Sequence, residues 1–329
     1  MSRRSHQPEV AEPPRARTAS GDMRRVGVEI EFAGVSVRDA ADLVAQAFGG
    51  TMDVESDHRI DVEGTRFGDF TVELDAAIAH KSGDKELKIA DKDVETISRQ
   101  LLGHAIAGPV PTEIVFPPVP WQELAALDDL LDRLRDAGAE GTRDAVYYGF
   151  GVHLNPEVAE ETADYALRHL QAYLILEDRL RDDIGVDPMR RVLPHIDPFP
   201  DGYALQLMDP DYAPGVADLI TDYVKANPTR SRGFDMMPLF RHLDEDTLLS
   251  HVDDASLIKA RPTFHYRLPN TELQDPDWSF VTDWNRWVGV EHLAMDDDKL
   301  AAAMAEYRAW LRKPTVDRWI DRLKAWAEE

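Results

Sequence analysis

The sequence of 329 residues contains no cysteine. This absence excludes a disulfide framework, a thiolate metal site and a cysteine nucleophile. Any metal site must therefore use carboxylates and histidines, of which the chain has 62 Asp and Glu and 11 His.

Basic residues are few: 37 Lys and Arg stand against 62 Asp and Glu, which gives a net charge of −25. Nucleic acids and anionic membranes both require clustered cations on their partners, so we expect this protein to bind neither. Long apolar runs are also missing. No stretch approaches the roughly 18 to 20 apolar residues of a membrane span, and the N-terminus lacks the apolar segment of a signal peptide. We therefore expect a cytoplasmic protein.

Several well-known enzyme motifs are absent from the sequence. It has no G-x-x-x-x-G-K-[ST] loop and no G-x-G-x-x-G turn after a strand, so an ATP-using protein of this sequence is neither a P-loop nor a Rossmann protein. The G-x-S-x-G and H-E-x-x-H motifs are missing too, which disfavours a serine hydrolase or a zinc peptidase.

The composition, 43% apolar and 30% charged, is typical of a folded soluble protein. Residues 1–23 are rich in Arg, Pro, Ser and Glu without apolar periodicity, which predicts a disordered N-terminal tail. Residues 24–329 are predicted to form a single domain that ends in helices. The predicted strands are 24–33, 70–78, 112–116, 147–155 and 259–268, and the predicted helices are 36–48, 91–102, 121–136, 156–181 and 214–225.

The predicted strands share one pattern, in which apolar residues alternate with acidic or basic ones. In the strand 24–33, Val28 and Ile30 lie on one side, and Glu29 and Glu31 lie on the other. The other strands repeat this alternation and place on their polar faces Thr71, Glu73, Asp75, Glu113, His153, Asn155, Arg261, Thr263, His265 and Arg267.

An ordinary sheet with one face in solvent explains any single strand of this kind. The first three strands, however, carry five carboxylates on that face and no Lys or Arg after Arg25. Carboxylates two residues apart on a strand lie about 7 Å apart and repel by about 2 kcal/mol at an effective dielectric of about 20. We interpret the cluster as a site for Mg²⁺ or Mn²⁺, which prefer oxygen ligands. On this hypothesis a Glu29→Gln change leaves stability unchanged or raises it, because it relieves repulsion.

Basic residues follow later in the chain. Arg261 and Arg267 are predicted to hold phosphate oxygens and to stabilise the charge of a phosphoryl transition state. Arg230 and Arg232 are candidates for binding a substrate carboxylate, with a salt-bridged surface turn as the alternative. From these residues alone, phosphoryl transfer and metal-dependent hydrolysis both stay open. The Pro- and Asp-rich segment 186–214 is the predicted lid that keeps water from the reaction.

Four motifs, in their order along residues 24–290, resemble the putative amidoligase enzymes, which are relatives of glutamate–cysteine ligase and glutamine synthetase. The motifs are Gly-Val-Glu-Ile-Glu-Phe at 27–32, the strand 72–78 with Asp75, Glu-Ile-Val-Phe-Pro-Pro at 113–118 and Gly-Val-His-Leu-Asn at 151–155. The resemblance implies an α+β fold similar to the glutamine synthetase catalytic domain. In that fold a curved, mostly antiparallel half-barrel sheet has helices on its outer face and the active site on its concave face.

The resemblance further implies ATP-dependent joining of a carboxylate and an amine. The carboxylate, of a small molecule or a peptide, attacks the γ-phosphorus of ATP, and the amine displaces phosphate from the acyl phosphate; Mg²⁺ or Mn²⁺ assists. By position in the family motifs, the implied metal ligands are Glu29, Glu31, Asp75, Glu113 and His153. The residues expected to bind the nucleotide are His153, Asn155, Arg261 and Arg267.

Catalytic roles are expected for Arg261, Arg267 and Glu73, and the candidates for the general base are His195, Asp197 and Glu73. One departure from the family pattern affects the metal site. The late strand commonly reads Glu-Phe-Arg in the family but reads His265-Tyr266-Arg267 here, which removes a possible metal carboxylate. This departure makes a catalytically inactive binding protein one alternative to a ligase. A metal-dependent hydrolase, which could use the same carboxylates, is the other. The sequence predicts no oligomeric state.

Overall fold

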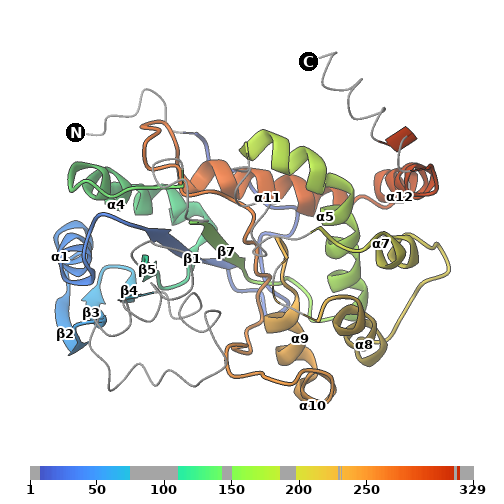
Figure 1. Cartoon of the computed structure of the whole chain (residues 1–329), viewed down its shortest axis with the longest axis horizontal. Helices are drawn as coiled ribbons and strands as arrows, with labels where there is room; N and C mark the ends of the chain where they lie inside the picture. Colours follow the sequence, from blue (N-terminus) through green and yellow to red (C-terminus); the bar gives the residue numbers. More distant parts are fainter. Residues whose placement is uncertain are drawn as a thin grey trace, which may run out of the picture.

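The computed structural model describes residues 8–74, 110–142, 150–185, 198–228, 230, 232–314 and 317–318. Its fold is α+β, as predicted, with a seven-stranded antiparallel sheet that does not close (Figure 1). The strands are β1 (Arg25–Phe32), β2 (Thr51–Ser56), β3 (Arg59–Thr65), β4 (Gly68–Leu74), β5 (Thr112–Val115), β6 (Val119–Pro120) and β7 (Val152–Pro156).

Helices pack around this sheet (Figure 1). They are α1 (Val37–Phe48), α4 (Leu124–Asp136), α5 (Ala163–Ile184), α7 (Asp201–Leu207), α8 (Val216–Ala226), α9 (Met237–Leu243), α10 (Glu245–Leu249), α11 (Phe280–Ala294) and α12 (Asp297–Leu311). Within the described ranges, no helix combines the length and the apolar character needed to cross a membrane.

Strand β1 lies in the middle of the sheet, between β5 and β7. Beyond β7 the sheet continues as isolated bridges, in which Leu154 pairs with Tyr266 and Tyr266 pairs with Phe234. The predicted strand 259–268 therefore exists only as short bridges. Gly233, next to the bridged Phe234, leaves room for α5, since a Cβ at this position would lie 2.3 Å from the Tyr173 hydroxyl.

The alternation on the strands separates a core face from a polar face. Val28, Ile30 and Ile114 are fully buried on the core face, which α1 covers at β3 and β4. Farther along, α11 packs on α4 and α5, and its Trp287 contacts the ring of Phe264 at a centroid distance of 5.4 Å. The prediction that the apolar side chains of these strands lie on one buried face is thus confirmed. Helices cover that face and remove these side chains from water.

The structure differs from the predicted helix 156–181 at its start. Pro156 ends β7, and the backbone N–H groups of Glu157 and Val158 still pair with Arg25 and Pro262. The helix α5 begins at Ala163, where the side chain of Thr162 accepts a hydrogen bond from the Tyr165 N–H. Strand pairing across the chain therefore prevails over the local preference of proline for a first helical turn.

Other sequence predictions have mixed outcomes. Ser36 caps α1 as expected, since its hydroxyl accepts from the Asp39 N–H. The hairpin of β2 and β3 was not predicted, and the predicted lid segment 186–214 contains α7 in its described part. The predicted helix 91–102 lies outside the described residues.

Residues 8–23, assigned to the predicted tail, contact α11. The backbone N–H of Ala11 donates to Oδ1 of Asn285 at 2.9 Å, and Nε1 of Trp284 donates to the Ala11 carbonyl at 2.9 Å. The chain therefore packs on the fold ahead of the predicted boundary at residue 23, because an indole and an amide on α11 capture its backbone. Residues 1–7 lie outside the described residues.

A charged cluster is buried under the core face. Arg24 and Glu291 form a two-pronged ion pair at 2.7 and 2.8 Å, and Trp287 donates to the same carboxylate at 2.7 Å. Beside it, the fully buried His169 has Nδ1 2.7 Å from the Tyr165 carbonyl. Burial lowers the pKa of His169 from 6.5 to about 4, although the Glu291 carboxylate opposes that shift.

The buried His169 predicts a pH-dependent stability. Because the unfolded chain binds a proton on this residue at a higher pH than the folded protein does, the stability is complete above about pH 6.5. It declines by about 3 kcal/mol as the pH falls toward 4. A His169→Asn variant keeps a donor near the Nδ1 position and should lose this part of the pH dependence. Urea unfolding at several pH values tests it, with His251→Asn as an exposed control; equal slopes for all three proteins would contradict the prediction.

Candidate active site

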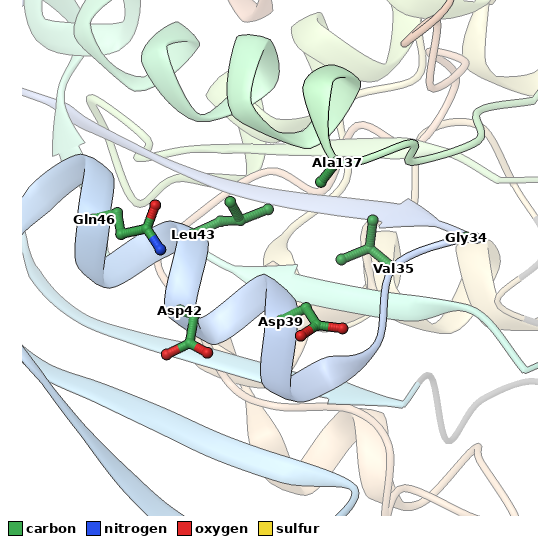
Figure 2. A pocket seen from close by; sticks show the side chains of 7 residues that line it. All are labelled: Gly34, Val35, Asp39, Asp42, Leu43, Gln46 and Ala137. Atoms are coloured by element: carbon green, nitrogen blue, oxygen red, sulfur yellow. The ribbon is translucent and has the colours of Figure 1, made fainter.

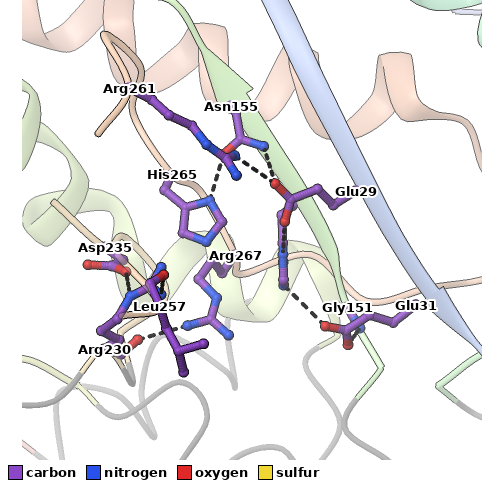
Figure 3. Close-up of polar contacts among 11 residues, drawn as sticks. Glu29, Glu31, Gly151, Asn155, Arg230, Asp235, Leu257, Arg261, His265 and Arg267 are labelled. Atoms are coloured by element: carbon purple, nitrogen blue, oxygen red, sulfur yellow. Dashed lines mark hydrogen bonds and ion pairs between the residues drawn. The ribbon is translucent and has the colours of Figure 1, made fainter. Parts of the chain in front are cut away.

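Glu29 on β1 lies at the centre of the polar face and makes three polar contacts. Its Oε2 lies 3.0 Å from Nδ1 of His153 on β7. Its Oε1 accepts hydrogen bonds from Nδ2 of Asn155, at 3.0 Å, and from Nη1 of Arg261, at 2.9 Å. Figure 3 shows Asn155 and Arg261 converging on this carboxylate from two different segments.

The charge state of Glu29 follows from these contacts. Burial raises the pKa of its carboxyl, but the hydrogen bond from His153 and the permanent charge of Arg261 oppose burial and prevail. The pKa of Glu29 therefore lies well below its ordinary value, and the group is ionised at neutral pH. The pKa of the adjacent His265 is also lowered well below its ordinary value, in this case by burial itself, which disfavours the charged imidazolium and keeps the imidazole neutral.

A second carboxylate, Glu31, lies one step along β1. Its Oε2 accepts a hydrogen bond from the Gly151 N–H at 3.0 Å, and its Oε1 lies 3.6 Å from Nε2 of His153. The strand register places Glu31 opposite Glu113, and Glu113 opposite Glu73 on β4. Three carboxylates thus form a row across β1, β5 and β4, as the shared alternation predicted.

The row ends in a cation from the unpredicted hairpin. Arg59 on β3 lies opposite Glu73, and the two side chains form an ion pair at 2.8 Å. The sequence pattern had suggested carboxylates without basic neighbours, but Arg59 and Arg261 pair with Glu73 and Glu29 from outside the first three strands. The repulsion hypothesis drawn from the sequence therefore does not describe Glu29, because its nearest charged neighbour, Arg261, attracts the carboxylate.

Two groups of side chains have the composition of a divalent-metal site. Glu31, Glu113 and His153 form one group, and Glu29, His153 and His265 form the other; within each group, one ligand atom per residue lies within 4.8 Å of the others. Carboxylate oxygens with one imidazole suit Mg²⁺ or Mn²⁺. The group of Glu31, Glu113 and His153, with two carboxylates and one imidazole, therefore fits the metal that the sequence predicted.

Of the other predicted basic residues, Arg267 lies near this cluster. Its position in the bridged segment is opposite Gly233, and its Nη1 donates to the carbonyl of Arg230 at 2.8 Å. Arg230 itself donates from Nε to Oδ2 of Asp235 at 2.9 Å and from Nη1 to the carbonyl of Leu257 at 2.5 Å. In Figure 3, Asn155 and Arg261 lie above His265, and Arg230 and Arg267 lie below it.

Arg232 is held by its own surroundings. Its side chain donates to Oδ1 of Asn227 at 2.7 Å and to the carbonyl of Pro198 at 2.6 Å, and its guanidinium lies 5.4 Å from the ring centre of Phe199. With 7% exposure, this guanidinium ties a loop to the fold. Arg232 thus makes buried structural contacts. These contacts match neither a salt-bridged surface turn nor a guanidinium free to bind a substrate.

Three predicted residues lie outside the described residues: the metal ligand Asp75 and the general-base candidates His195 and Asp197. His265 lies with Glu29 and His153 in a group that could hold a metal, although the sequence pattern indicated only a lost carboxylate at this position. The signal was present, since the alternation put His265 on the polar face with Arg267.

A pocket of about 320 Å³ lies elsewhere, between α1 and the end of α4 (Figure 2). Its lining includes Asp39, Asp42 and Gln46 and no lysine, arginine or histidine. A surface that presents two carboxylates without a cation is unsuited to a phosphate, so this pocket is not the candidate site.

Comparison with protein families gives one result. The family model described as "Putative amidoligase enzyme" matches residues 22–289. This match covers more than half of the chain, so the chain belongs to that family, whose name indicates a ligase. No curated protein and no solved structure matches the chain.

Proposed function

We propose that this member of the amidoligase family is an ATP- and divalent-metal-dependent ligase, which joins a carboxylate to an amine through an acyl phosphate. The observation that supports this most is the meeting of Glu29, Glu31 and His153 with Arg261 on one polar face. We further propose that the sheet is curved as in the glutamine synthetase catalytic domain, that residues 24–329 form one catalytic domain, and that the protein works in the cytoplasm.

The ions of this ligase, Mg²⁺ or Mn²⁺, would be held by Glu29, Glu31, Glu113 and His153, with Asp75 as a further ligand. When bound, such an ion neutralises phosphate charge and orients the nucleotide. The pairing of β1 with β5 sets the backbone spacing of these carboxylates before an ion binds.

Phosphoryl transfer needs position and charge more than covalent chemistry from the protein. In the resting protein Arg261 is paired with Glu29 at 2.9 Å, and its side chain is 34% exposed, so its guanidinium is accessible to an incoming phosphate. We assign Arg261 and Arg267 to the transferred phosphoryl group, His153 and Asn155 to the nucleotide side of the site, and Arg230 to the substrate carboxylate.

The incoming amine requires a proton acceptor. Of the three candidates, Glu73 is the one that lies among the described residues. Its carboxylate is paired with Arg59 at 2.8 Å and is partly exposed, so it lies where an amine from solvent can approach. The substrates are a small-molecule or peptide carboxylate and an amine. Segment 186–214 is the proposed lid, since an acyl phosphate must be kept from water.

The decisive experiment measures ADP and phosphate release from ATP with Mg²⁺ or Mn²⁺, across a panel of carboxylates and amines. We expect release that depends on both substrates, together with an amide product by mass spectrometry. Amide or phosphoester cleavage without nucleotide would favour the metal-dependent hydrolase. Absence of Mg²⁺-ATP binding by calorimetry would favour the inactive binding protein.

A further inference from the structure

A second imidazole lies beside the site because of the pairing beyond β7. The ring centroid of His265 is 5.1 Å from that of His153, and the two rings are inclined by 73°. Together with Glu29, each residue offers one ligand atom within 4.8 Å of the others. All three side chains belong to residues that are more than nine-tenths buried. A cluster of two imidazoles and one carboxylate is therefore built into the interior edge of the polar face.

Hydrogen bonds determine which nitrogen of His265 carries the proton. The ionised Glu29 only accepts, so the amide nitrogen of Asn155 faces it, at 3.0 Å. The amide oxygen of Asn155 then faces Nδ1 of His265, at 2.6 Å, and Nδ1 must be the donor (Figure 3). Nε2 consequently keeps its lone pair.

That lone pair has no hydrogen-bond partner among the residues that the structure describes. A metal-binding histidine typically has this arrangement, in which one nitrogen donates to a fixed acceptor and the other is left for the ion. Asn155 thereby orients His265 and Glu29 at once, since its two amide atoms bind one residue each.

We infer that His265 binds a metal ion together with Glu29 and His153, and that this second imidazole makes the site select Zn²⁺ over Mg²⁺. Mg²⁺ prefers an all-oxygen shell, whereas imidazole nitrogen suits Zn²⁺ and other transition ions. A glutamate at the position of His265 would have supplied oxygen and a second negative charge. The neighbouring group of Glu31 and Glu113 with His153 is richer in oxygen and keeps the character of a Mg²⁺ or Mn²⁺ site.

Binding would set the spacing of the ligand atoms. Two ligands of a tetrahedral Zn²⁺ ion stand about 3.4 Å apart, because each bond is about 2.1 Å long. The three ligand atoms already lie within 4.8 Å of one another, so side-chain rotations are enough to bring them to this spacing. Glu29 would also exchange Arg261 for the ion. The release of Arg261 for phosphate binding rests on the proposed function, which assigns this guanidinium to the phosphoryl group. The selective binding of Zn²⁺ does not rest on it.

The test uses untagged full-length protein stripped of metal and titrated calorimetrically with ZnCl₂ or MgCl₂. We expect His265→Gln to weaken the tightest Zn²⁺ binding by about tenfold or more. His265→Glu should weaken Zn²⁺ binding and strengthen Mg²⁺ binding. The exposed His251→Gln serves as the matched control and should leave both affinities unchanged. Unaltered Zn²⁺ affinity in both His265 variants would overturn the inference.

A spectroscopic measurement on the unmodified protein decides the matter even if a variant fails to fold. Electron spin echo spectra of the protein loaded with one equivalent of Cu²⁺, a paramagnetic ion that prefers imidazole ligands as Zn²⁺ does, should show coupling to two imidazoles. Coupling to a single imidazole would overturn the assignment of His265. Neither measurement uses ATP or substrates, so failure of the ligase proposal and failure of this inference give different results.

Discussion

A Glu29→Gln variant is expected to lose at least about 100-fold in amine-dependent phosphate release, because one residue sets the positions of a cation, an imidazole and an amide. The side chain keeps its shape but loses its charge. Arg261 then has no ionised partner at 2.9 Å, and the orientation of Asn155 is no longer dictated by a carboxylate. The measurement is steady-state phosphate release with saturating ATP and metal.

The same variant tests the electrostatics of the resting site. Hydrogen bonds to charged groups stabilise by about 1.5 to 3 kcal/mol each, so the free energy of unfolding should fall by about 1 to 3 kcal/mol after partial compensation. Glu63→Gln, on an exposed position of β3, is the matched control and should change neither property. Equal or greater stability of Glu29→Gln would instead support the repulsion hypothesis drawn from the sequence.

The largest loss of stability is expected from Glu291→Gln on α11. Arg24 is 1% exposed and Glu291 is fully buried, so neutralising one partner leaves a buried guanidinium without its counter-charge. Breaking a buried pair in this way costs about 3 to 5 kcal/mol. Urea unfolding monitored by tryptophan fluorescence measures the change directly, since Trp287 donates to the same carboxylate.

Two further variants separate the charge from the packing. An Arg24→Met and Glu291→Leu double variant removes both charges and should regain part of the lost stability, although Arg24 also donates to the carbonyls of Arg15 and Glu157. Glu306→Gln, exposed on α12, is the control. A Glu291→Gln protein as stable as the unmodified chain would mean that the pair is not a net contributor to folding.

Local alternation was sufficient to place the residues of β1, β5 and β7 on their faces. The predictions for Glu29, Glu31, Glu113 and His153 needed only the two-residue period of a strand, and the structure brings all four together. Asn155 follows the same rule. The predicted helix start at Pro156 failed for a different reason, because strand pairing with Arg25 extends one residue beyond the proline.

Contacts across long stretches of chain were beyond such reasoning. Arg261 meets Glu29 across 232 residues of sequence, and no pattern near either residue specifies that distance. Arg59 pairs with Glu73 only because β3 lies beside β4. The contacts of Arg232 were beyond prediction for the same reason, since its partners Asn227, at the end of α8, and Pro198, ahead of α7, lie in separate segments that meet only in the packed fold.

The amino-acid sequence by itself determined the family, the absence of thiol chemistry and the acidic face of the strands, because these depend on composition and on neighbours two residues apart. Tertiary structure alone decided which charges meet. It gave Glu29 a guanidinium instead of a competing carboxylate and turned His265 from a missing ligand into a second imidazole. The physical reason is that electrostatic interactions depend on distance in space, and strand register sets that distance only after the chain has folded.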